Sequence, residues 1–256
     1  MTVDEGRILT AEGIQMRFGG VTALDGVSVH IPAGRVSGLI GPNGAGKSTL
    51  LGILSGAHRP DFGTVRFNGV NLTGAGRTVA AHSGVIQTFQ KASPFRGMTV
   101  LENVLVGMTN RFDPGLFGVL FRPRLVRRTE RQWRERAQEL LEEFGLSEYA
   151  QADAASLSFG QLRLLELARA MLAEPQILLL DEPAAGLNAQ ETKLIHQAVV
   201  RVRDNGVGVL IVDHDVRFLF GLCDHIIAMD YGRIIAEGPP EDVERDPAVR
   251  AAYLTV

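Results

Sequence analysis

A glycine-rich loop occupies residues 41–49 and reads Gly41-Pro42-Asn43-Gly44-Ala45-Gly46-Lys47-Ser48-Thr49. It follows the apolar run Val36–Ile40 and precedes a second apolar stretch that begins near Lys47. This order predicts a strand, a tight turn and a helix, which is the context in which the pattern G-x-x-x-x-G-K-[ST] binds phosphate. The alternative is a glycine-rich turn that fits the pattern by chance. Such a turn would not need to lie between a strand and a helix, as this loop is predicted to do. We therefore predict a nucleoside-triphosphate site at this loop.

Each residue type in the loop suits one part of a triphosphate. Glycines allow the backbone to turn so that its N–H groups converge on phosphate oxygens. The N-terminus of the following helix adds partial positive charge. Lys47 is expected to neutralise the terminal phosphates, Ser48 to offer its hydroxyl to Mg²⁺, and Thr49 to support the helix start. The predicted nucleotide-binding residues of the loop are Gly41, Asn43, Gly44, Gly46, Lys47, Ser48 and Thr49.

Two adjacent carboxylates, Asp181 and Glu182, end a second apolar strand at Ile177–Leu180. Ligands gather at the carboxyl ends of strands in open α/β sheets, so both acids are expected in the crevice that holds the phosphate loop. We assign Asp181 to the Mg²⁺ shell, through water, and Glu182 to the water that attacks the γ-phosphate. Taken alone, the sequence Asp-Glu-Pro would be interpreted as a solvated turn. Its pairing with the phosphate loop favours the functional interpretation.

The composition excludes several classes of protein. The chain has 256 residues and a formal net charge of −3, which indicates neither nucleic acid nor an anionic membrane as its partner. Its one cysteine, Cys223, excludes an internal disulfide framework and a multi-cysteine metal site. No stretch approaches the roughly 18 consecutive apolar residues of a membrane span, and the N-terminus lacks the pattern of a signal peptide. We expect a soluble chain whose link to a membrane comes through partners.

The pattern along the chain predicts an α/β core interrupted by a helical lobe. Both ends alternate short strands and helices, and the middle carries a strong helical pattern that Gly145 closes. The predicted strands are Ile8–Phe18, Val27–Ile31, Val36–Ile40, Thr64–Phe67 after a turn at Pro60–Gly63, Ile177–Leu180, Val207–Val212, and a hairpin of Ile226–Met229 and Arg233–Glu237. The predicted helices run from Gly46 to near Gly56 and over Glu130–Phe144, Leu162–Leu172 and Ala189–Asp204.

The sequence Leu157-Ser158-Phe159-Gly160-Gln161 resembles the signature motif of ABC ATPases, which usually reads Leu-Ser-Gly-Gly-Gln. Ser158 and Gln161 form an S-x-x-Q capping box, and the N-terminus of the helix that the box opens is suited to an anion. In this family that helix faces the γ-phosphate held by another subunit. The resemblance therefore implies nucleotide contacts for Ser158, Gly160 and Gln161. Phe159 stands where the family usually has glycine.

Further segments stand in the order that the ABC family requires. Gln90 resembles the glutamine that touches Mg²⁺ and the attacking water, and Ala185–Asn188 resembles the loop that crosses the dimer interface. His214 resembles the switch histidine that contacts the γ-phosphate, and Phe18 resembles the aromatic residue that stacks on adenine. Each of these residues alone would be interpreted as ordinary core or surface. Their order and placement carry the resemblance.

The resemblance covers nearly the whole chain and implies a P-loop NTPase core of ABC type, with an N-terminal antiparallel β subdomain and an inserted helical subdomain. Residues 1–90 and 171–256 would form the nucleotide-binding core, and residues 91–170 the helical subdomain with the signature motif. The implied cofactors are ATP and Mg²⁺. The implied catalytic residues are Glu182, His214 and Gln90, and the implied metal ligands are Ser48, Gln90 and Asp181.

The family also implies partners. They are a second ABC cassette, identical or different, two transmembrane permease subunits and, indirectly, an extracytoplasmic substrate-binding protein, with no nucleic acid. The chain would lie at the cytoplasmic face of the inner (plasma) membrane, held there by the permeases. The loop Ala92–Thr99, which contains Phe95, is our predicted docking surface for them.

The subfamily that the chain most resembles imports branched-chain amino acids. The resemblance rests on Arg17–Gly20, Pro183–Asn188, the extended region Asn110–Arg136 and the stretch from Ala236 to Leu254. It implies an ATPase that energises import of branched-chain or other hydrophobic amino acids, with importers of urea, amides or aromatic acids as the alternative. An ABC ATPase acting on nucleic acid or ribosomes would usually carry two cassettes or a long coiled-coil insertion. A P-loop kinase would not need Leu157–Gln161.

Overall fold

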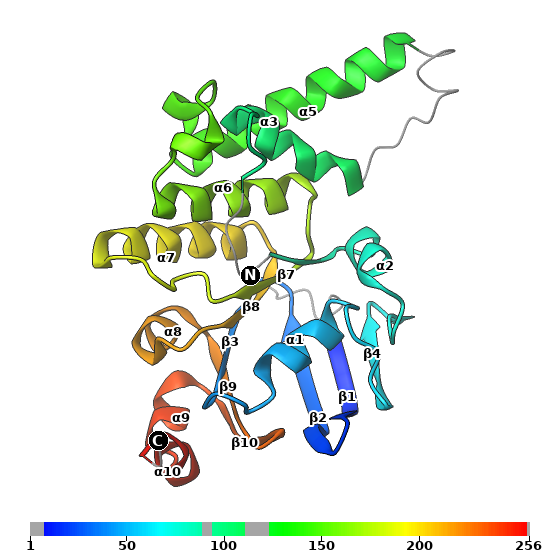
Figure 1. The fold of residues 1–256 in the computed structure, drawn as a ribbon, viewed down its shortest axis with the longest axis vertical. Coiled ribbons are helices and arrows are strands. Elements are labelled where there is room, and N and C mark those ends of the chain that lie inside the picture. The colour runs from blue at the N-terminus through cyan, green and yellow to red at the C-terminus, as the bar shows by residue number, and fades with distance from the viewer. Residues whose placement is uncertain (1–7, 89–93, 111–122, 255–256) are drawn as a thin grey trace. The chain divides into compact units, whose positions relative to one another are not determined.

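The computed structural model describes residues 8–88, 94–110 and 123–254, and the chain divides into two compact units. Unit 1 comprises Met1–Gln90 and Gln176–Val256, and unit 2 comprises Lys91–Pro175. Figure 1 shows the strands in unit 1 and a set of helices in unit 2. Helix α6 (Phe159–Leu172) continues across residue 170, where the sequence placed a boundary. The functional division into a nucleotide-binding core and a helical subdomain stays a prediction.

The central sheet of unit 1 has six strands in the order β10-β9-β3-β8-β7-β6. Neighbouring strands pair in parallel, except that β9 and β10 form an antiparallel hairpin. Every residue of β3 and β8 is buried, as expected of parallel strands covered on both faces. The strands are β3 (Val36–Ile40), β6 (Val85–Gln87), β7 (Ile177–Asp181), β8 (Gly208–Val212), β9 (His225–Asp230) and β10 (Arg233–Gly238).

The second sheet of unit 1 is antiparallel, in the order β2-β1-β4-β5. The turn predicted at Pro60–Gly63 is wrong at its last two positions, because strand β4 already begins at Phe62. Gly63 serves a close approach between strands: a Cβ there would lie 2.6 Å from the carbonyl oxygen of Glu12 in β1. The strands are β1 (Ile8–Phe18), β2 (Val21–Pro32), β4 (Phe62–Phe67) and β5 (Val70–Asn71).

The helices of unit 1 alternate with its strands, and their ends follow local sequence rules. Helix α7 begins after Asn188, whose side chain accepts hydrogen bonds from the backbone of Gln190 and Glu191 in a capping box. The predicted span of this helix is confirmed. The described helices of unit 1 are α1 (Lys47–Leu54), α2 (Arg77–His82), α7 (Ala189–Asp204), α8 (Val216–Leu222), α9 (Pro240–Arg245) and α10 (Pro247–Leu254).

The regular elements in the described part of unit 2 are helices, and helix α6 contacts both α3 and α5. Its buried side chains include Leu101, Leu141 and Leu165. Helix α5 begins at Pro123, earlier than the predicted Glu130, since proline is well accommodated in the first turn of a helix. The elements are α3 (Val100–Leu105), η1 (Val106–Asn110), α5 (Pro123–Glu143), η2 (Ser147–Tyr149), η3 (Ala154–Ser156) and α6 (Phe159–Leu172).

The apolar side chains of unit 1 gather in one core that joins its two sheets. The core includes Leu24 from β2, Leu50 from α1 and Leu210 from β8. The single cysteine, Cys223, is buried at the end of α8, and this burial raises the pKa of its thiol. No helix in the described part of the chain is long and apolar enough to cross a membrane.

Candidate nucleotide-binding site

The phosphate loop joins β3 to α1, and its shape depends on glycine. Gly46 stands directly before α1 at φ +100, a conformation that residues with a Cβ rarely adopt. A Cβ there would lie 2.5 Å from the carbonyl oxygen of Ala23 in β2. The strand, turn and helix predicted around residues 41–49 are confirmed. The first turn of α1 therefore carries Lys47, Ser48 and Thr49.

Lys47 lies within its own loop and within electrostatic reach of the two predicted acids. Its Nζ donates hydrogen bonds to the carbonyl oxygens of Gly41 at 2.6 Å and Pro42 at 2.9 Å. Burial lowers the pKa of the Lys47 ammonium, and the nearby carboxylates of Glu182 and Asp181 act in the opposite direction. The fold thus brings the loop lysine and both acids together.

Asp181 ends β7, and Glu182 begins the loop that follows. The backbone N–H of Glu182 donates to the carbonyl oxygen of Val212 in β8 at 2.7 Å. Glu182 adopts φ +51, an uncommon conformation for a residue with a side chain. Backbone conformations of this kind persist only where the surrounding structure holds them, and they cluster at functional sites. The position of the predicted catalytic carboxylate is therefore set by the neighbouring strand.

His214 follows β8 and lies beside Glu182. Its Nδ1 is 4.0 Å from Glu182 Oε1 and 3.6 Å from Asp213 Oδ1, and its side chain is 68% exposed. Both distances are longer than a hydrogen bond. The imidazole can therefore rotate toward a ligand without first breaking a strong contact to either carboxylate.

Asp213 is a site residue that the sequence reasoning missed. It is buried, with 1% of its surface exposed. Its Oδ2 accepts from the backbone N–H of Ala184 at 3.2 Å, and its Oδ1 accepts from that of Asp215 at 3.0 Å. It thereby links the loop after β7, which carries Glu182, to the loop after β8, which carries His214. A carboxylate directly after a buried strand is the pattern that identified Asp181, and the same pattern could have identified Asp213.

Phe18 ends β1 and has an exposed face suited to stacking. The residue is 48% exposed, and its ring meets the ring of His58 edge-on, with centroids 6.1 Å apart. His58 also packs against Gly52 of α1, where any Cβ would clash with the imidazole. No pattern in the sequence connects His58 with Phe18, because the contact forms only when the segment after α1 packs against the end of β1.

The signature residues lie in unit 2 at the start of α6. Ser158 caps the helix: its Oγ accepts from the backbone N–H of Gln161 at 3.3 Å, and Gln161 Oε1 accepts from that of Ser158 at 2.9 Å. The predicted capping box is confirmed. Gly160 is buried in the first turn. Phe159 is exposed, and the guanidinium of Arg163 lies 5.3 Å from its ring centroid.

The donor groups around Lys47 fit a magnesium ion that is bound mainly by phosphate. Mg²⁺ usually keeps several waters and takes one or two carboxylates together with substrate phosphates. Unit 1 offers the Ser48 hydroxyl in α1 and the Asp181 carboxylate near Lys47. Within the described residues, no group of three or more His, Cys, Asp or Glu side chains could hold a metal by itself. Gln90, the third predicted ligand, lies outside the described residues, as do residues 92 and 93 of the predicted docking loop.

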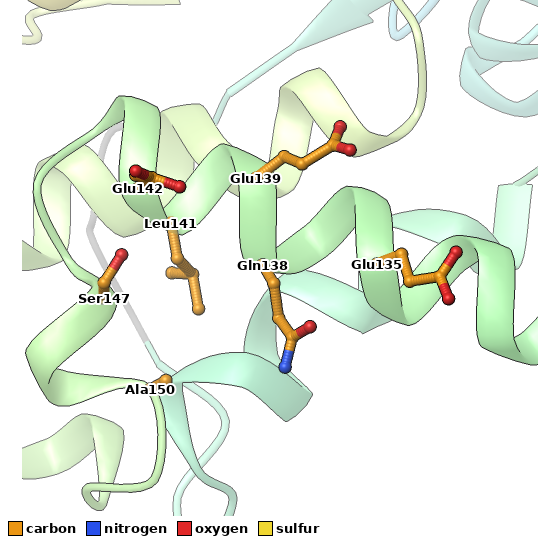
Figure 2. A pocket seen from close by; sticks show the side chains of 7 residues that line it. All are labelled: Glu135, Gln138, Glu139, Leu141, Glu142, Ser147 and Ala150. Carbon is orange, nitrogen blue, oxygen red and sulfur yellow. The ribbon is translucent and has the colours of Figure 1, made fainter.

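A hollow of about 460 Å³ lies in unit 2, and none of the residues that line it is a predicted nucleotide contact. Figure 2 shows that Gln138 and Leu141 point from α5 toward the segment that carries Ser147 and Ala150. One of its carboxylates, Glu139, pairs with Arg136 at 2.8 Å in an exposed ion pair, which contributes little to stability. The hollow is lined by Glu135, Gln138, Glu139, Leu141, Glu142, Ser147 and Ala150.

A family model described as ABC transporter matches residues 24–185, and one described as branched-chain amino acid ATP-binding cassette transporter matches residues 233–254. The chain is 40% identical over 248 residues to the high-affinity branched-chain amino acid transport ATP-binding protein BraF of Pseudomonas aeruginosa, covering 96% of this chain and 97% of that protein.

Two solved structures place the fold in the same group. The ADP conformation of MJ1267, an ATP-binding cassette of an ABC transporter, is similar with a TM-score of 0.85 at 33% identity, over 98% of this chain and 99% of that one. The dimeric structure of MJ0796, a bacterial ABC transporter cassette, is similar with a TM-score of 0.73 at 25% identity, over 91% and 98%. The chain therefore belongs to the ABC transporter family and is one of its nucleotide-binding, ATP-hydrolysing cassettes.

Proposed function

We propose that this chain energises the import of branched-chain or other hydrophobic amino acids. The observation that carries the proposal is the match of 96% of the chain to BraF. The C-terminal match at residues 233–254 supports the same cargo. The chain would work at the cytoplasmic face of the inner membrane, beneath two permease subunits that receive the amino acid from an extracytoplasmic binding protein.

The proposed nucleotide site holds ATP through the phosphate loop and the aromatic face of β1. Backbone N–H groups and Lys47 would bind the β- and γ-phosphates, and Phe18 would stack on adenine. When bound, Mg²⁺ neutralises charge on the phosphates, and Ser48, Asp181 and Gln90 are the residues that would hold it. The electrostatic influence of Glu182 and Asp181 on Lys47 supports the role of this loop in binding ATP and Mg²⁺.

In the proposed reaction, water attacks the γ-phosphorus in line with the bond to the β-phosphate. Glu182 would orient this water and take its proton as the new oxygen–phosphorus bond forms. The bond to the β-phosphate oxygen breaks, and ADP leaves with both electrons of that bond. His214 would contact the γ-phosphate, which its position beside Glu182 supports.

We propose that a second cassette completes each site. The Ser158 cap gives α6 a well-ordered N-terminus, and the N-terminus of a helix attracts anions. The phosphate loop of one molecule and the signature helix of the other would then grip the same γ-phosphate. The dimeric ABC cassette among the similar structures supports pairing of this kind. Loss of the γ-phosphate contacts on hydrolysis would release the two cassettes.

Transport by the assembled importer tests the proposal. The chain is co-purified with its permeases, placed in vesicles with ATP inside, and supplied with the binding protein and labelled leucine, urea, an amide or an aromatic acid. We expect ATP-dependent uptake of leucine, and we expect Glu182→Gln to reduce it by a factor of roughly 10² or more. Uptake of another class in place of leucine would overturn the cargo. Undiminished uptake by Glu182→Gln would overturn the role of that carboxylate.

A further inference from the structure

The turn between β9 and β10 is hydrogen-bonded to the phosphate loop. The backbone N–H of Gly232 donates to the carbonyl oxygen of Ala45 in the loop at 3.1 Å. The carbonyl oxygen of Gly232 accepts from the backbone N–H of Asp25 in β2 at 2.9 Å. One residue of the hairpin therefore joins the phosphate loop, which follows a strand of the central sheet, to a strand of the antiparallel sheet.

Glycine is needed on both sides of this junction. Gly232 adopts φ +75, and a Cβ there would lie 2.7 Å from the carbonyl oxygen of Ala23 in β2. The same oxygen would lie 2.5 Å from a Cβ on Gly46 in the phosphate loop. Strand β2 thus packs directly against both the hairpin turn and the loop, and neither glycine leaves room for a side chain.

An ion pair joins the same two segments at the surface. Arg233, the first residue of β10, donates to Oδ2 of Asp25 from Nε at 3.0 Å and from Nη2 at 2.6 Å. Strand β10 also contacts β2 (Figure 1). The side chains of Arg233 and Asp25 are 70% and 37% exposed, so the pair contributes little to the stability of the whole fold. Its importance lies in its place, directly beside the backbone bonds of Gly232.

The hydrogen bond from Gly232 sets the orientation of one peptide group in the phosphate loop. In a trans peptide the C=O of one residue and the N–H of the next point in opposite directions. Because the C=O of Ala45 is directed at the hairpin, the N–H of Gly46 points away from it. Backbone N–H groups of this loop are the proposed phosphate ligands. If the turn moved off the loop, this peptide could rotate, and nucleotide binding would then have to order it.

We propose that Asp25 and Arg233 are positioning residues for the nucleotide: their ion pair holds the β9–β10 turn on the phosphate loop and so fixes the peptide before Gly46. Strand β2 also pairs with β1 as far as Phe18, so the same contact fixes the loop relative to the sheet that carries this ring. The inference rests on the nucleotide site of the proposed function alone, and a different cargo would leave it standing.

Calorimetric binding of ADP tests the ion pair. We expect Arg233→Gln to raise the dissociation constant roughly two- to fivefold, the range for one partly exposed ion pair. Arg203→Gln is the matched control, because Arg203 also donates from Nε and Nη2 to one carboxylate oxygen, that of Asp204. That pair lies within helix α7, and its loss should leave the dissociation constant unchanged.

A double-mutant cycle separates the contact from the two residues that make it. Asp25→Ala removes the acceptor and should weaken ADP binding as Arg233→Gln does. The double variant should bind ADP no more weakly than the weaker single variant, because both substitutions remove the same contact. The KM for ATP should rise by a similar factor while kcat changes by less than about twofold, as expected for a residue that only helps to bind the nucleotide.

Amide hydrogen exchange tests the backbone link between the turn and the loop. If the turn strengthens nucleotide binding, the nucleotide must stabilise the turn by the same factor. Saturating ADP should therefore slow exchange of the Gly232 N–H in the wild type, and clearly less in Arg233→Gln. Exchange that ADP leaves unchanged in the wild type would overturn the proposal.

Three further outcomes would contradict it. They are equal ADP affinities of Arg233→Gln and Arg203→Gln, single effects that multiply in the double variant, and a kcat that falls with KM unaltered. A wild-type chain that fails to bind ADP would overturn the nucleotide site together with this inference. Failure of the site and failure of the ion pair are therefore distinguishable.

Discussion

Asp213 holds a carboxylate where almost no water reaches it. Burial of a charge is costly unless hydrogen bonds compensate, and both oxygens of this side chain accept from backbone N–H groups. The two donors, Ala184 and Asp215, lie in the loops that carry Glu182 and His214. Asp213 therefore joins the loop that carries the predicted base to the loop that carries the predicted switch histidine.

We expect Asp213→Asn to lower kcat for ATP hydrolysis about tenfold or more while KM changes less than about threefold. The amide would present its NH₂ group to one of the two backbone donors, and a buried unpaired donor costs roughly 1–3 kcal/mol. Steady-state kinetics at saturating ATP provide the measurement. Asp213→Glu keeps the charge and should restore part of the rate. A kcat that falls only in proportion to the loss of folded protein would contradict this role.

At the scale of helices and strands, the sequence predicted the features that depend on residues close together along the chain. The capping box of Ser158 and Gln161 and the strand–loop–helix around Lys47 follow from local chemistry, and both are present. Gly63 was misinterpreted as a turn because its close approach to β1 depends on a partner far along the chain. The contacts of Asp213 were not predicted for the same reason: they join segments that only the sheet brings together.

The cap of α6 is expected to affect both stability and activity. Ser158→Ala should destabilise the cassette by about 1 kcal/mol, since the N–H of Gln161 loses its acceptor. If the helix N-terminus also meets phosphate, the ATPase rate should fall much further, by at least tenfold at saturating ATP. Asp153→Ala removes the side-chain cap of η3 in the same unit and serves as the control. Equal ATPase rates in the two variants would show that Ser158 has only a structural role.

At the scale of the whole molecule, each chain carries one phosphate loop in unit 1 and one signature helix in unit 2. The proposed head-to-tail pairing divides each site between two chains. A pair of defective chains can then contain one intact site, provided that their defects lie in opposite halves. This property distinguishes a shared site from a site completed within a single chain.

Mixing Lys47→Ala with Ser158→Arg tests the shared site. Each variant alone should hydrolyse ATP at a small fraction of the wild-type rate, but a mixed dimer retains one site with an intact loop and an intact helix tip. We expect activity to return on mixing, and the wild-type rate to rise with the square of concentration while dimers are scarce. Strict proportionality to concentration, with no recovery on mixing, would exclude pairing of identical chains.

Phe95 lies in the described part of the loop that we propose as the docking surface for the permeases, and a substitution there tests the proposal. Its side chain is exposed, and the guanidinium of Arg169 lies 5.1 Å from the ring centroid. Phe95→Asp should reduce co-purification with the permeases at least several-fold, because a charge would replace the apolar ring at the interface. Tyr149→Asp makes a similar change at another exposed aromatic of unit 2. Equal recovery of permeases with both variants would place the docking surface elsewhere.

Cys223 has a practical consequence for such experiments. Its sulfur is enclosed by the protein and its thiol resists ionisation, so maleimide reagents should find no reactive thiolate in the folded chain. A cysteine introduced on the surface could therefore be labelled with a fluorophore while Cys223 stays unlabelled. Labelling of the native thiol would in turn report, molecule by molecule, how often unit 1 opens.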